Sequence, residues 1–416
     1  MRRGLLLLLG LLAPILASAG APAGAAGQSS FCSGLQPRLV AGGGRASGLF
    51  VMDAESGRVV CGMAARRPRP LASNMKLFTT ATALARFGPK YRIATKVLRD
   101  GALDRDGVLR GNLYLKGGGD PALGVPAFYD RYLGGMGTNL FALKRQIRED
   151  GVGTVTGRLY ADDSVFDRLR GVADSGYATS IYIGPLSGLA FDSGYSSPAA
   201  QSFAADPAKL AAETLLHSLR AAGVAIRGGV ALGAAPSTSA PLATVESPDM
   251  SRLVQTTDVY SDNFFAETLL KLLGTRFGGE GSTRAGAAVV EKFAHAHDSG
   301  VHAVDGSGLT RSNRASPFQI VHFLDAMRDT AVGDEFVHDL ALAGHDGTVA
   351  DRMHGTAADG RCRTKTGTIT GVSNLSGYCF NRDGRLMIFS ILMAGVGDLG
   401  LAHYEQDRIA AAVASY

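Results

Sequence analysis

The sequence predicts an α+β protein in which an antiparallel sheet flanked by helices is interrupted by a large β-rich insertion. Helical patterns at residues 73–86 and 250–273 bracket a block, residues 91–248, that contains many short strand patterns separated by Asp/Gly turns. The end of the chain adds three strand patterns, at residues 363–370, 374–381 and 386–394. We therefore expect a main domain made of residues 28–90 and 249–416. The insertion, residues 91–248, is expected to form either one unit or two nested units.

The first residues have the composition of an export signal. Arg2 and Arg3 precede an apolar run at residues 4–16, and Ala17-Ser18-Ala19 matches the small residues that precede a cleavage site. An apolar run of about 13 residues is too short to span a bilayer, and no later run is long and apolar enough. We expect residues 1–19 to be removed, which leaves no transmembrane segment. The product is expected in the periplasm or, more broadly, in the cell envelope or outside the cell.

Composition narrows the possible partners. Hydrophobic residues make up 46% of the 416 residues and charged residues 19%, which is ordinary for a globular protein with a sizeable core. The formal net charge of +5 includes Arg2 and Arg3 of the expected signal, so the exported chain carries only a small positive excess. This balance argues against nucleic acid as a partner.

Four cysteines in an exported chain are expected to form disulfides. Cys362 and Cys379 lie symmetrically about a predicted turn near Thr370, so they can face each other across a hairpin. This arrangement favours the pairs Cys362–Cys379 and Cys32–Cys61. Four cysteines allow three connectivities, and the sequence leaves the choice open.

The first third of the chain has recognisable boundaries. Residues 49–52 and 58–62 are expected to form two strands around an Asp-Ala-Glu-Ser-Gly turn. Pro68 and Pro70 then resist helix formation, and the next helix begins at Ser73 and ends near the Gly-Pro pair at residues 88–89. Strand patterns follow within the insertion, at residues 92–98, 108–116 and 154–161.

The sequence also predicts a helix in the second half of the insertion and indicates where the chain returns to the main domain. Asp206 as N-cap and a proline at the first helical position predict a helix at residues 206–222. A segment rich in Ala, Ser, Thr and Pro, residues 233–248, marks the boundary. The long helical pattern after it breaks once, near Tyr260. Further helical patterns lie at residues 291–293 and 317–327.

The first helix of the main domain offers a nucleophile and a base. Ser73 and Lys76 are three residues apart, so on a helix they share a face and the Ser73 hydroxyl lies within reach of the Lys76 amine. A serine beside a lysine can act as a nucleophile whose proton the lysine removes. Taken alone, the pair fits a helix N-cap followed by a solvated lysine better than it fits a catalytic site.

Two further motifs favour the catalytic interpretation. The helix break reads Ser261-Asp262-Asn263, and the late hairpin begins Lys365-Thr366-Gly367-Thr368. Each has a structural explanation of its own, the first as a helix break with local side-chain bonds and the second as a charged edge strand. All three motifs in this order arise by chance in roughly one chain in a hundred or fewer. Gly367 is expected where the substrate backbone approaches the strand, because a side chain would block that approach.

Ser-x-x-Lys, Ser-Asp-Asn and Lys-Thr-Gly together are the signature of penicillin-binding proteins and class A β-lactamases. From about residue 45 to its end, the chain resembles the D-alanyl-D-alanine carboxypeptidase/endopeptidase family, the low-molecular-mass class C penicillin-binding proteins. Besides the catalytic motifs, the resemblance rests on Gly-Gly-Gly-Asp120-Pro, Gly184-Pro-Leu-Ser-Gly-Leu-Ala, Asp305-Gly-Ser-Gly-Leu and Gly347-Thr-Val-Ala-Asp-Arg. It implies a DD-peptidase/β-lactamase-like domain with a large insertion between the first two motifs.

The resemblance also implies an activity. It predicts a serine-type D-Ala-D-Ala carboxypeptidase or endopeptidase that acts on peptidoglycan stem peptides through an acyl-enzyme at Ser73. Penicillins and other β-lactams are expected to acylate the same serine, and no cofactor is implied. Lys76 is then the base, its pKa lowered by burial and by the charge of Lys365, and Ser261 passes the proton to the leaving amine.

The remaining site residues are assigned by the same resemblance. Asn263 is expected to hydrogen-bond the amide of the substrate. The terminal carboxylate is expected to be held by Lys365, Thr366 and Thr368. The backbone amides of Ser73 and Thr368 are expected to form the oxyanion hole. Asp162 of the insertion lies where the family carries an acidic residue that faces the site, but a structural carboxylate in a turn explains this residue at least equally well.

Two alternatives stay open. One is a β-lactamase, although class A enzymes have a much shorter interval between the first two motifs. They also carry a Glu-x-x-x-Asn element for deacylation, which is absent between Asn263 and Lys365, so rapid β-lactam turnover is not expected. The other is a cell-wall-binding or penicillin-sensing module that is acylated and turns over little. The sequence leaves the choice between carboxypeptidase and endopeptidase open.

Other chemistries find less support. The chain has no Gly-x-Ser-x-Gly nucleophile elbow, which argues against a Ser-His-Asp hydrolase. The glycine-rich segment at residues 117–121 lacks the Lys-Ser/Thr that a phosphate-binding loop needs. His295, His297 and His302 are expected to be solvated rather than metal ligands, because residues two apart on a helix do not share a face. No metal site is expected.

Overall fold

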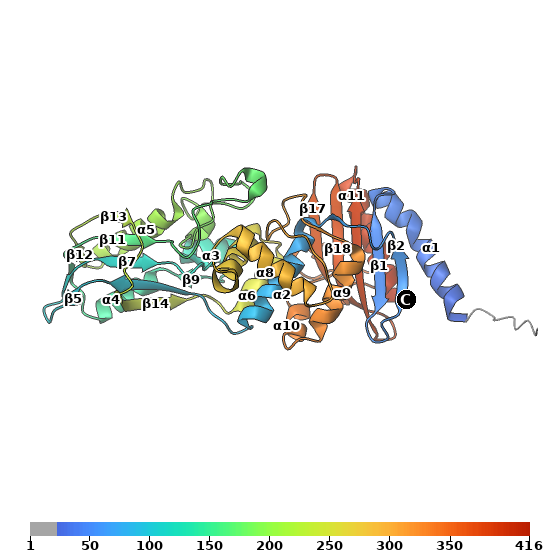
Figure 1. The fold of residues 1–416 in the computed structure, drawn as a ribbon, viewed down its shortest axis with the longest axis horizontal. Helices are drawn as coiled ribbons and strands as arrows, with labels where there is room; N and C mark the ends of the chain where they lie inside the picture. The colour runs from blue at the N-terminus through green and yellow to red at the C-terminus, as the bar shows by residue number, and fades with distance from the viewer. Residues whose placement is uncertain (1–22) are drawn as a thin grey trace, which may run out of the picture.

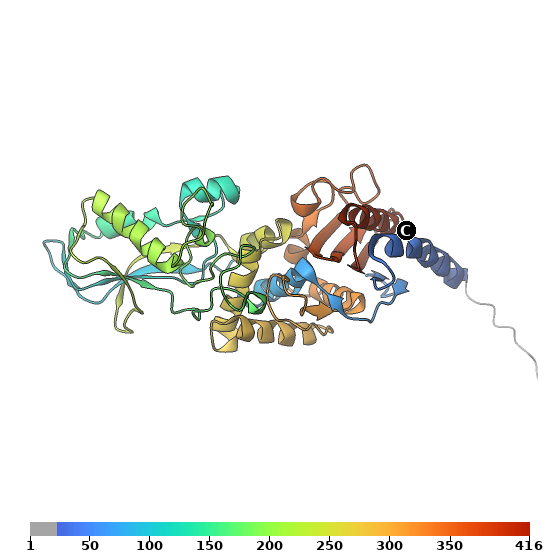
Figure 2. The same cartoon turned by 90° about the horizontal axis from the view of Figure 1, so that it is seen from above.

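The computed structural model describes residues 23–416 of the chain, with side chains from residue 30 onward. The expected signal segment, residues 1–19, lies outside this range. The molecule is elongated, with a large sheet and its helices at one end and the strand-rich insertion at the other (Figures 1 and 2). Over the described residues, no helix is both long enough and apolar enough to cross a bilayer.

An antiparallel sheet of six strands forms the main domain. Its strands are β1 (Gly48–Asp53), β2 (Val59–Met63), β16 (Ala341–Leu342), β17 (Cys362–Ile369), β18 (Val372–Phe380) and β19 (Leu386–Ala394). They lie in the order β16-β17-β18-β19-β1-β2. Gly48 of β1 lies opposite Leu392 of β19, so the first strands of the chain extend the hairpins formed by the last ones.

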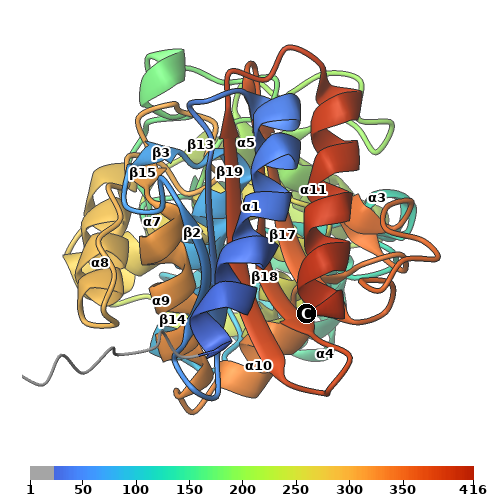
Figure 3. The same ribbon diagram turned by 90° about the vertical axis from the view of Figure 1, so that its right-hand side faces the viewer.

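Helices cover both faces of this sheet. On the outer face, α1 (Ala23–Gly43) and α11 (Leu399–Ser415) lie side by side, as Figure 3 shows. They enclose an apolar core with side chains of the sheet such as Leu49 and Phe389. On the inner face, α2 (Met75–Phe87) and α9 (Pro317–Arg328) pack in a second core, and the Tyr378 hydroxyl of β18 donates to the Leu324 carbonyl.

The helices between the sheet and the insertion differ in part from the expectation. The pattern at residues 250–273 forms α6 (Met250–Val259) and α7 (Asn263–Leu273), separated at the predicted break. The short pattern at residues 291–293 belongs to the longer α8 (Thr283–His295), whose small residues had hidden its periodicity. The remaining elements here are α10 (Gly333–His338), β3 (Arg69–Pro70) and β15 (Arg314–Ala315).

The insertion has two sheets and a core of its own. One sheet has the order β13-β11-β7-β4-β14 and the other β12-β10-β6-β5. The strands are β4 (Ala94–Arg99), β5 (Ala102–Leu103), β6 (Val108–Arg110), β7 (Leu113–Lys116), β10 (Thr154–Val155), β11 (Leu159–Asp162), β12 (Ala225–Ile226), β13 (Val230–Leu232) and β14 (Ala240–Glu246). Several pairs are parallel, such as β7 with β11, so helical crossovers are required between them.

Helices supply these crossovers. The elements are α3 (Pro126–Tyr132), α4 (Phe141–Glu149) and α5 (Pro207–Ala221), with the short strands β8 (Leu123–Gly124) and β9 (Thr138–Asn139). The helix predicted at residues 206–222 is α5, and Asp206 caps it by accepting from the Lys209 amide. The insertion is thus less purely β than expected, because α3 and α4 lie between its strands in addition to the predicted α5.

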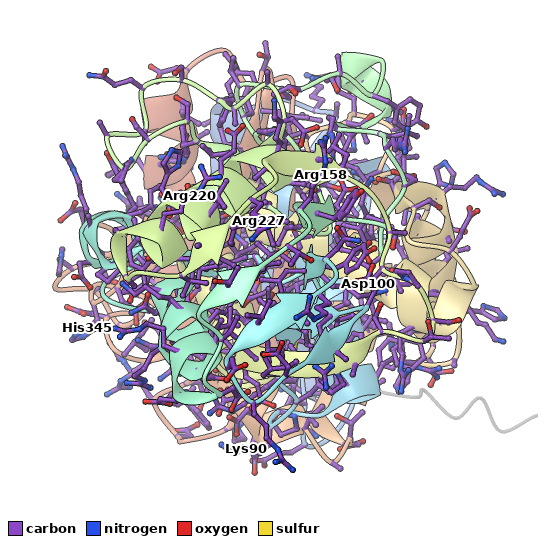
Figure 4. The ribbon with its side chains drawn as sticks, turned by 90° about the vertical axis from the view of Figure 1, so that its left-hand side faces the viewer. Lys90, Asp100, Arg158, Arg220, Arg227 and His345 are labelled. Atoms are coloured by element: carbon purple, nitrogen blue, oxygen red, sulfur yellow. A yellow bond between two sulfur atoms is a disulfide. The ribbon has the colours of Figure 1, made fainter. Side chains whose placement is uncertain are left out.

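The insertion leaves and rejoins the main domain at one place. Its first and last strands, β4 and β14, pair antiparallel, with Ala94 opposite Glu246. We therefore keep residues 91–248 as the proposed bounds of the insertion. The free end, which Figure 4 faces, carries Arg158, Arg220 and Arg227.

Both disulfides join segments that pack together. Cys362 and Cys379 are directly opposite in the β17–β18 hairpin, and a disulfide links them. A second disulfide, Cys32–Cys61, ties α1 to β2. These are the two pairs that the hairpin symmetry favoured.

Candidate active site

Ser73 lies just before α2, in a turn that packs against strand β17. Ser73 belongs to a single 3₁₀ turn, η1 (Ala72–Asn74), that leads directly into α2. Ala72 before it has a positive φ of 45°, an unusual conformation for a residue with a side chain. Lys76 lies in the first turn of α2, and its Nζ is 3.1 Å from the Ser73 Oγ. The predicted nucleophile and base therefore face each other within hydrogen-bond distance.

The Lys76 amine is completely buried, and three oxygen atoms surround it. Besides Ser73, it donates to the Asn263 Oδ1 at 2.7 Å and to the backbone carbonyl of Ser307 at 2.8 Å. Burial lowers its pKa to about 8, although the carboxylates of Glu267, Asp262, Asp305 and Asp258 oppose this shift. A lysine with a pKa near 8 is neutral often enough at physiological pH to accept a proton.

Ser261 and Asn263 lie at the break between α6 and α7. Ser261 adopts a positive φ of 59°, which turns the chain sharply at this point. Asp262 then caps α7 by accepting the amide hydrogen of Phe265 at 2.9 Å, so Asn263 becomes the first residue of the helix. This capped turn positions the Asn263 side chain toward Lys76, while its Nδ2 donates to the Tyr182 carbonyl at 3.0 Å.

Lys365 lies on β17 and is also completely buried. Its Nζ donates to the Thr366 carbonyl at 3.1 Å, and burial together with the charge of Lys76 lowers its pKa to about 7. The pKa of both lysines is thus lowered, mainly by burial, and the charge of Lys76 adds to the lowering at Lys365. Thr366 donates from its Oγ1 to the Thr348 Oγ1 at 2.8 Å.

Gly367 packs tightly against the nucleophile turn, a contact that the sequence analysis did not anticipate. A Cβ at this position would lie 2.9 Å from the Leu71 carbonyl oxygen and 3.0 Å from the amide nitrogens of Ser73 and Asn74. These are tighter than ordinary contacts, so the glycine is required by the close packing of β17 against the nucleophile segment. The protein's own backbone therefore leaves no room for a side chain here, and the approach of a substrate backbone to this strand stays a prediction.

A polar network under the nucleophile was missed by the sequence analysis. The Asn74 Nδ2 donates to the Lys365 carbonyl at 2.8 Å, and the Ser376 hydroxyl donates to the Asn74 Oδ1 at 2.7 Å. The Asn374 Nδ2 donates to the carbonyls of Pro70 and Leu71. These bonds hold the Ser73 turn against the β17–β18 hairpin. Their residues are adjacent to the recognised motifs, but nothing in a single sequence marks them as partners.

A second missed group fixes the carbonyl that binds Lys76. The Glu267 carboxylate, completely buried on α7, accepts the amide hydrogens of Gly306 and Ser307. The Asp305 carboxylate accepts from the amides of Gly308 and Thr310. Together they shape the Asp305-Gly-Ser-Gly loop so that the Ser307 carbonyl points at the amine. The Ser307 hydroxyl itself is buried and has no hydrogen-bond partner among the described residues.

A cavity of about 670 Å³ opens above the serine. Its wall includes Ser73, Ser261, Asn263 and Thr368, so the three motifs meet around one space. The rest of the wall comes from three segments: the loop with Leu309 and Arg311, the end of β17 and its turn with Ile369 and Thr370, and the insertion with Val172, Asp174, Ser175, Ser180 and Tyr182.

The prediction that Asp162 faces this cavity is wrong. Asp162 ends β11, where its buried carboxylate accepts from the amides of Ser164 and Ala235 and lies 3.4 Å from the Lys116 amine. The insertion instead presents Asp174, which lines the cavity and accepts from the Thr310 hydroxyl at 2.7 Å. The next loop places Arg311 in the same wall, so the cavity offers charges of both signs.

The histidines considered as metal ligands do not gather. His297 bonds to the Phe293 carbonyl and His302 to the Glu291 carboxylate. Within residues 23–416, no group of three or more His, Cys, Asp or Glu side chains is arranged to hold a metal ion.

Comparison with known proteins covers almost all of the described chain. The model of the D-Ala-D-Ala carboxypeptidase 3 (S13) family matches residues 35–205 and 198–414. A D-alanyl-D-alanine carboxypeptidase from Actinomadura sp. (strain R39) is 31% identical over 90% of this chain and 82% of its own length. The carboxypeptidase DacB of Mycolicibacterium smegmatis is 29% identical over 84% of this chain and 76% of its own length.

Solved structures show the same fold. The penicillin binding protein 4 of Haemophilus influenzae aligns with a TM-score of 0.76 and 20% identity, over 92% of this chain and 99% of its own. A predatory peptidoglycan endopeptidase from Bdellovibrio bacteriovorus aligns with a TM-score of 0.54 and 18% identity, over 87% of this chain and 90% of its own. The predicted architecture, an α+β domain interrupted by an insertion, is confirmed.

Proposed function

Because the chain belongs to the D-Ala-D-Ala carboxypeptidase 3 (S13) family, we propose that it is a serine peptidase that cleaves the bond between two D-alanines in peptidoglycan stem peptides. The observation that carries this proposal is the contact between the buried Lys76 amine and the Ser73 hydroxyl at 3.1 Å. A serine nucleophile needs such a base within reach, and the lowered pKa of Lys76 suits it to that role.

In the acylation step, the neutral Lys76 amine takes the proton of the Ser73 hydroxyl as the oxygen attacks the carbonyl carbon of the penultimate D-alanine. The C–N bond then breaks, and the leaving amine receives a proton through Ser261, which lines the same cavity. The terminal D-alanine departs, and an ester joins the remaining peptide to Ser73. Water attacks this ester in the second step, with Lys76 again accepting a proton, and releases the shortened peptide.

Binding of the peptide is assigned to the two walls of the cavity. We propose that Asn263 hydrogen-bonds the peptide amide on one side and that Thr368 of β17 holds it on the other. Lys365, Thr366 and Thr368 are then the partners of the terminal carboxylate. The backbone amides of Ser73 and Thr368 form the oxyanion hole, where one donor is typically worth about 3–4 kcal/mol. Asp174 and Arg311 lie where a charged part of the peptide can pair with them.

Penicillins are proposed to acylate Ser73 in the same way. The penicillin binding protein 4 of Haemophilus influenzae has been solved with a β-lactam, and that protein shares the fold of this chain. A hydrolysing enzyme and a penicillin-acylated sensing module differ in turnover, and carboxypeptidases among the relatives favour the enzyme. An endopeptidase also shares this fold, so cross-linked peptides are a second possible class of substrate.

Peptidoglycan lies outside the cytoplasm, so the proposal includes export directed by residues 1–19.

Release of D-alanine tests this function most simply. The wild-type chain, incubated with a pentapeptide that ends in D-Ala-D-Ala, is expected to release D-alanine with multiple turnovers. Ser73→Ala is expected to abolish release, whereas Ser237→Ala, which changes an exposed serine in the insertion, is a matched control. Stoichiometric penicillin binding without D-alanine release would favour the sensing module, and rapid penicillin hydrolysis would favour a β-lactamase.

A further inference from the structure

A second pocket, of about 390 Å³, lies directly beside the reaction cavity. The two share Tyr182 and Asn263 in their walls, so they meet at a catalytic residue. The pocket is formed by α3 of the insertion, by the loop that carries Ile181 and Tyr182, and by the start of α7. Figure 1 shows α3 at the end of the insertion that lies nearest the main-domain helices α6 and α8.

Aromatic and aliphatic side chains of this pocket are unusually exposed. The exposed fractions are 79% for Ile181, 68% for Tyr182 and 42% for Tyr132. Apolar side chains gathered at an exposed site mark a surface that a ligand covers. These side chains adjoin Asn263, so one ligand can cover them and also reach into the reaction cavity.

The aromatic wall is already in place before any ligand binds. The ring centres of Phe128 and Tyr132 are 5.1 Å apart, and those of Phe128 and Tyr195 are 6.0 Å apart. The Tyr132 hydroxyl donates to the Ala199 carbonyl at 3.0 Å, which fixes the direction of that ring. A ligand can therefore stack on these rings without ordering them first.

Charge distinguishes this pocket from the reaction cavity. Among the residues that line it within the described chain, Asp262 alone is charged, and one of its oxygens already accepts from the Phe265 amide. Arg131 contacts the ring of Tyr132, with its guanidinium carbon 5.3 Å from the ring centre, but does not line the pocket. A peptide bearing carboxylates would meet Asp262 with no lining cation to offset the repulsion. A neutral ligand with hydroxyl groups would meet a hydrogen-bond acceptor instead.

We propose that this pocket is a subsite for a neutral sugar ring of the glycan to which the stem peptide is attached. Sugar rings present apolar C–H faces that pack on aromatic rings, and their hydroxyls can bond to Asp262, Ser193 and the Tyr195 hydroxyl. The stem peptide, bound between Asn263 and β17, runs past Tyr182 to place its sugar here. The inference rests on the proposed function, which supplies the peptide, and adds that glycan-attached peptides are the preferred substrates.

The test compares two substrates that differ only in the sugar: a pentapeptide ending in D-Ala-D-Ala, either free or attached to its disaccharide. For the wild type, kcat/KM for D-alanine release is expected to favour the glycan-attached form by about tenfold, mainly through KM. Tyr132→Ala is expected to bring this preference close to one. Ile181→Ser, at a side chain too exposed to matter for folding, is expected to weaken the preference as well.

The controls separate this inference from the proposed function. Tyr404→Ala, at another exposed tyrosine, on α11 with 53% exposure, is expected to keep the full preference. Equal rates on both substrates for the wild type, or equal losses on both in Tyr132→Ala, would overturn the sugar subsite. A selective loss on glycan-free cross-linked peptides would overturn it in favour of an acceptor peptide. Failure to release D-alanine from either substrate or to bind benzylpenicillin would overturn the proposed function and the subsite with it.

Discussion

The Nζ of Lys76 lies 2.7 Å from the Oδ1 of Asn263, a residue 187 positions later in the chain. This bond joins α2, which follows the nucleophile turn, to α7, which begins where the chain returns from the insertion. The same amine contacts Ser73 and the Ser307 carbonyl. Three distant segments are therefore held around one buried amine, and predictions about the site follow from its position and charge.

Removal of the Lys76 amine should stop acylation. Lys76→Met keeps a long apolar side chain in the buried space but leaves Ser73 without a base. The rate of benzylpenicillin acylation, followed by intact-protein mass spectrometry, is expected to fall by about 10²–10⁴-fold. Lys292→Met, at an exposed lysine on α8, is the matched control and should acylate at the wild-type rate. Acylation of Lys76→Met at the control rate would exclude Lys76 as the base.

The acylation rate should rise with pH. Lys76 acts as a base only when it is neutral, and burial lowers its pKa to about 8. Below that pH the amine is protonated, so the rate is expected to fall about tenfold per pH unit, and above it the rate should level off. Stopped-flow measurements of acylation between pH 6 and pH 10 test this. A rate that is constant across this range would contradict the assignment.

Glu267 should shift this pH profile without touching the substrate. Its carboxylate raises the pKa of Lys76 and orients the Ser307 carbonyl through two backbone amides. Glu267→Gln removes the charge and keeps most of the shape, so the midpoint of the acylation profile is expected to move to lower pH. A purely structural role would lower the melting temperature and leave the midpoint unchanged.

Gly367→Ala should damage the site more than the fold. The added methyl group would press on the backbone of Leu71, Ser73 and Asn74. Overpacking of this kind typically costs about 1–3 kcal/mol of stability, and here the strain displaces the nucleophile. Acylation is expected to slow by at least about tenfold. Gly229→Ala, where no atom lies within 4 Å of the new Cβ, is the control. Wild-type acylation by Gly367→Ala would show that the contact is not needed.

Lys271 should affect peptides more than penicillin. This buried lysine of α7 donates to the Asp167 carboxylate and to the Leu169 carbonyl, and so anchors the insertion loop that leads to Asp174 and Tyr182. Lys271→Met is expected to raise KM for the pentapeptide several-fold and lower stability by about 1–3 kcal/mol. The benzylpenicillin acylation rate should change little. Equal effects on both ligands would show that the loop does not contribute to peptide binding.

The sequence predicts the centre of the site well and its surroundings poorly. Ser73, Lys76, Ser261 and Asn263 could be found because chemistry restricts both the residue types and the local spacing. Asn74, Asn374 and Glu267 could not, because each acts through backbone groups that lie close only after folding. Such contacts leave no spacing pattern in a single sequence.

The fold shows the same difference between features with a local sequence pattern and features that depend on distant contacts. The strands of the hairpin around Gly371 were predictable from long apolar and β-branched runs, whereas α3 and α4 are short helices whose place depends on parallel strand pairing. Asp162 was selected by the family resemblance, yet its neighbours Lys116 and Ala235 hold it within the insertion. Asp174 lies in a loop whose course a sequence cannot reveal.

Mass spectrometry of the chain after exposure to benzylpenicillin tests the central claim most directly. The claim is that Ser73 is the nucleophile activated by Lys76. We predict one penicillin adduct per chain, located on the peptide that contains Ser73, and no adduct on Ser73→Ala. An adduct that persists in Ser73→Ala, or no adduct on a folded wild-type chain, would contradict it.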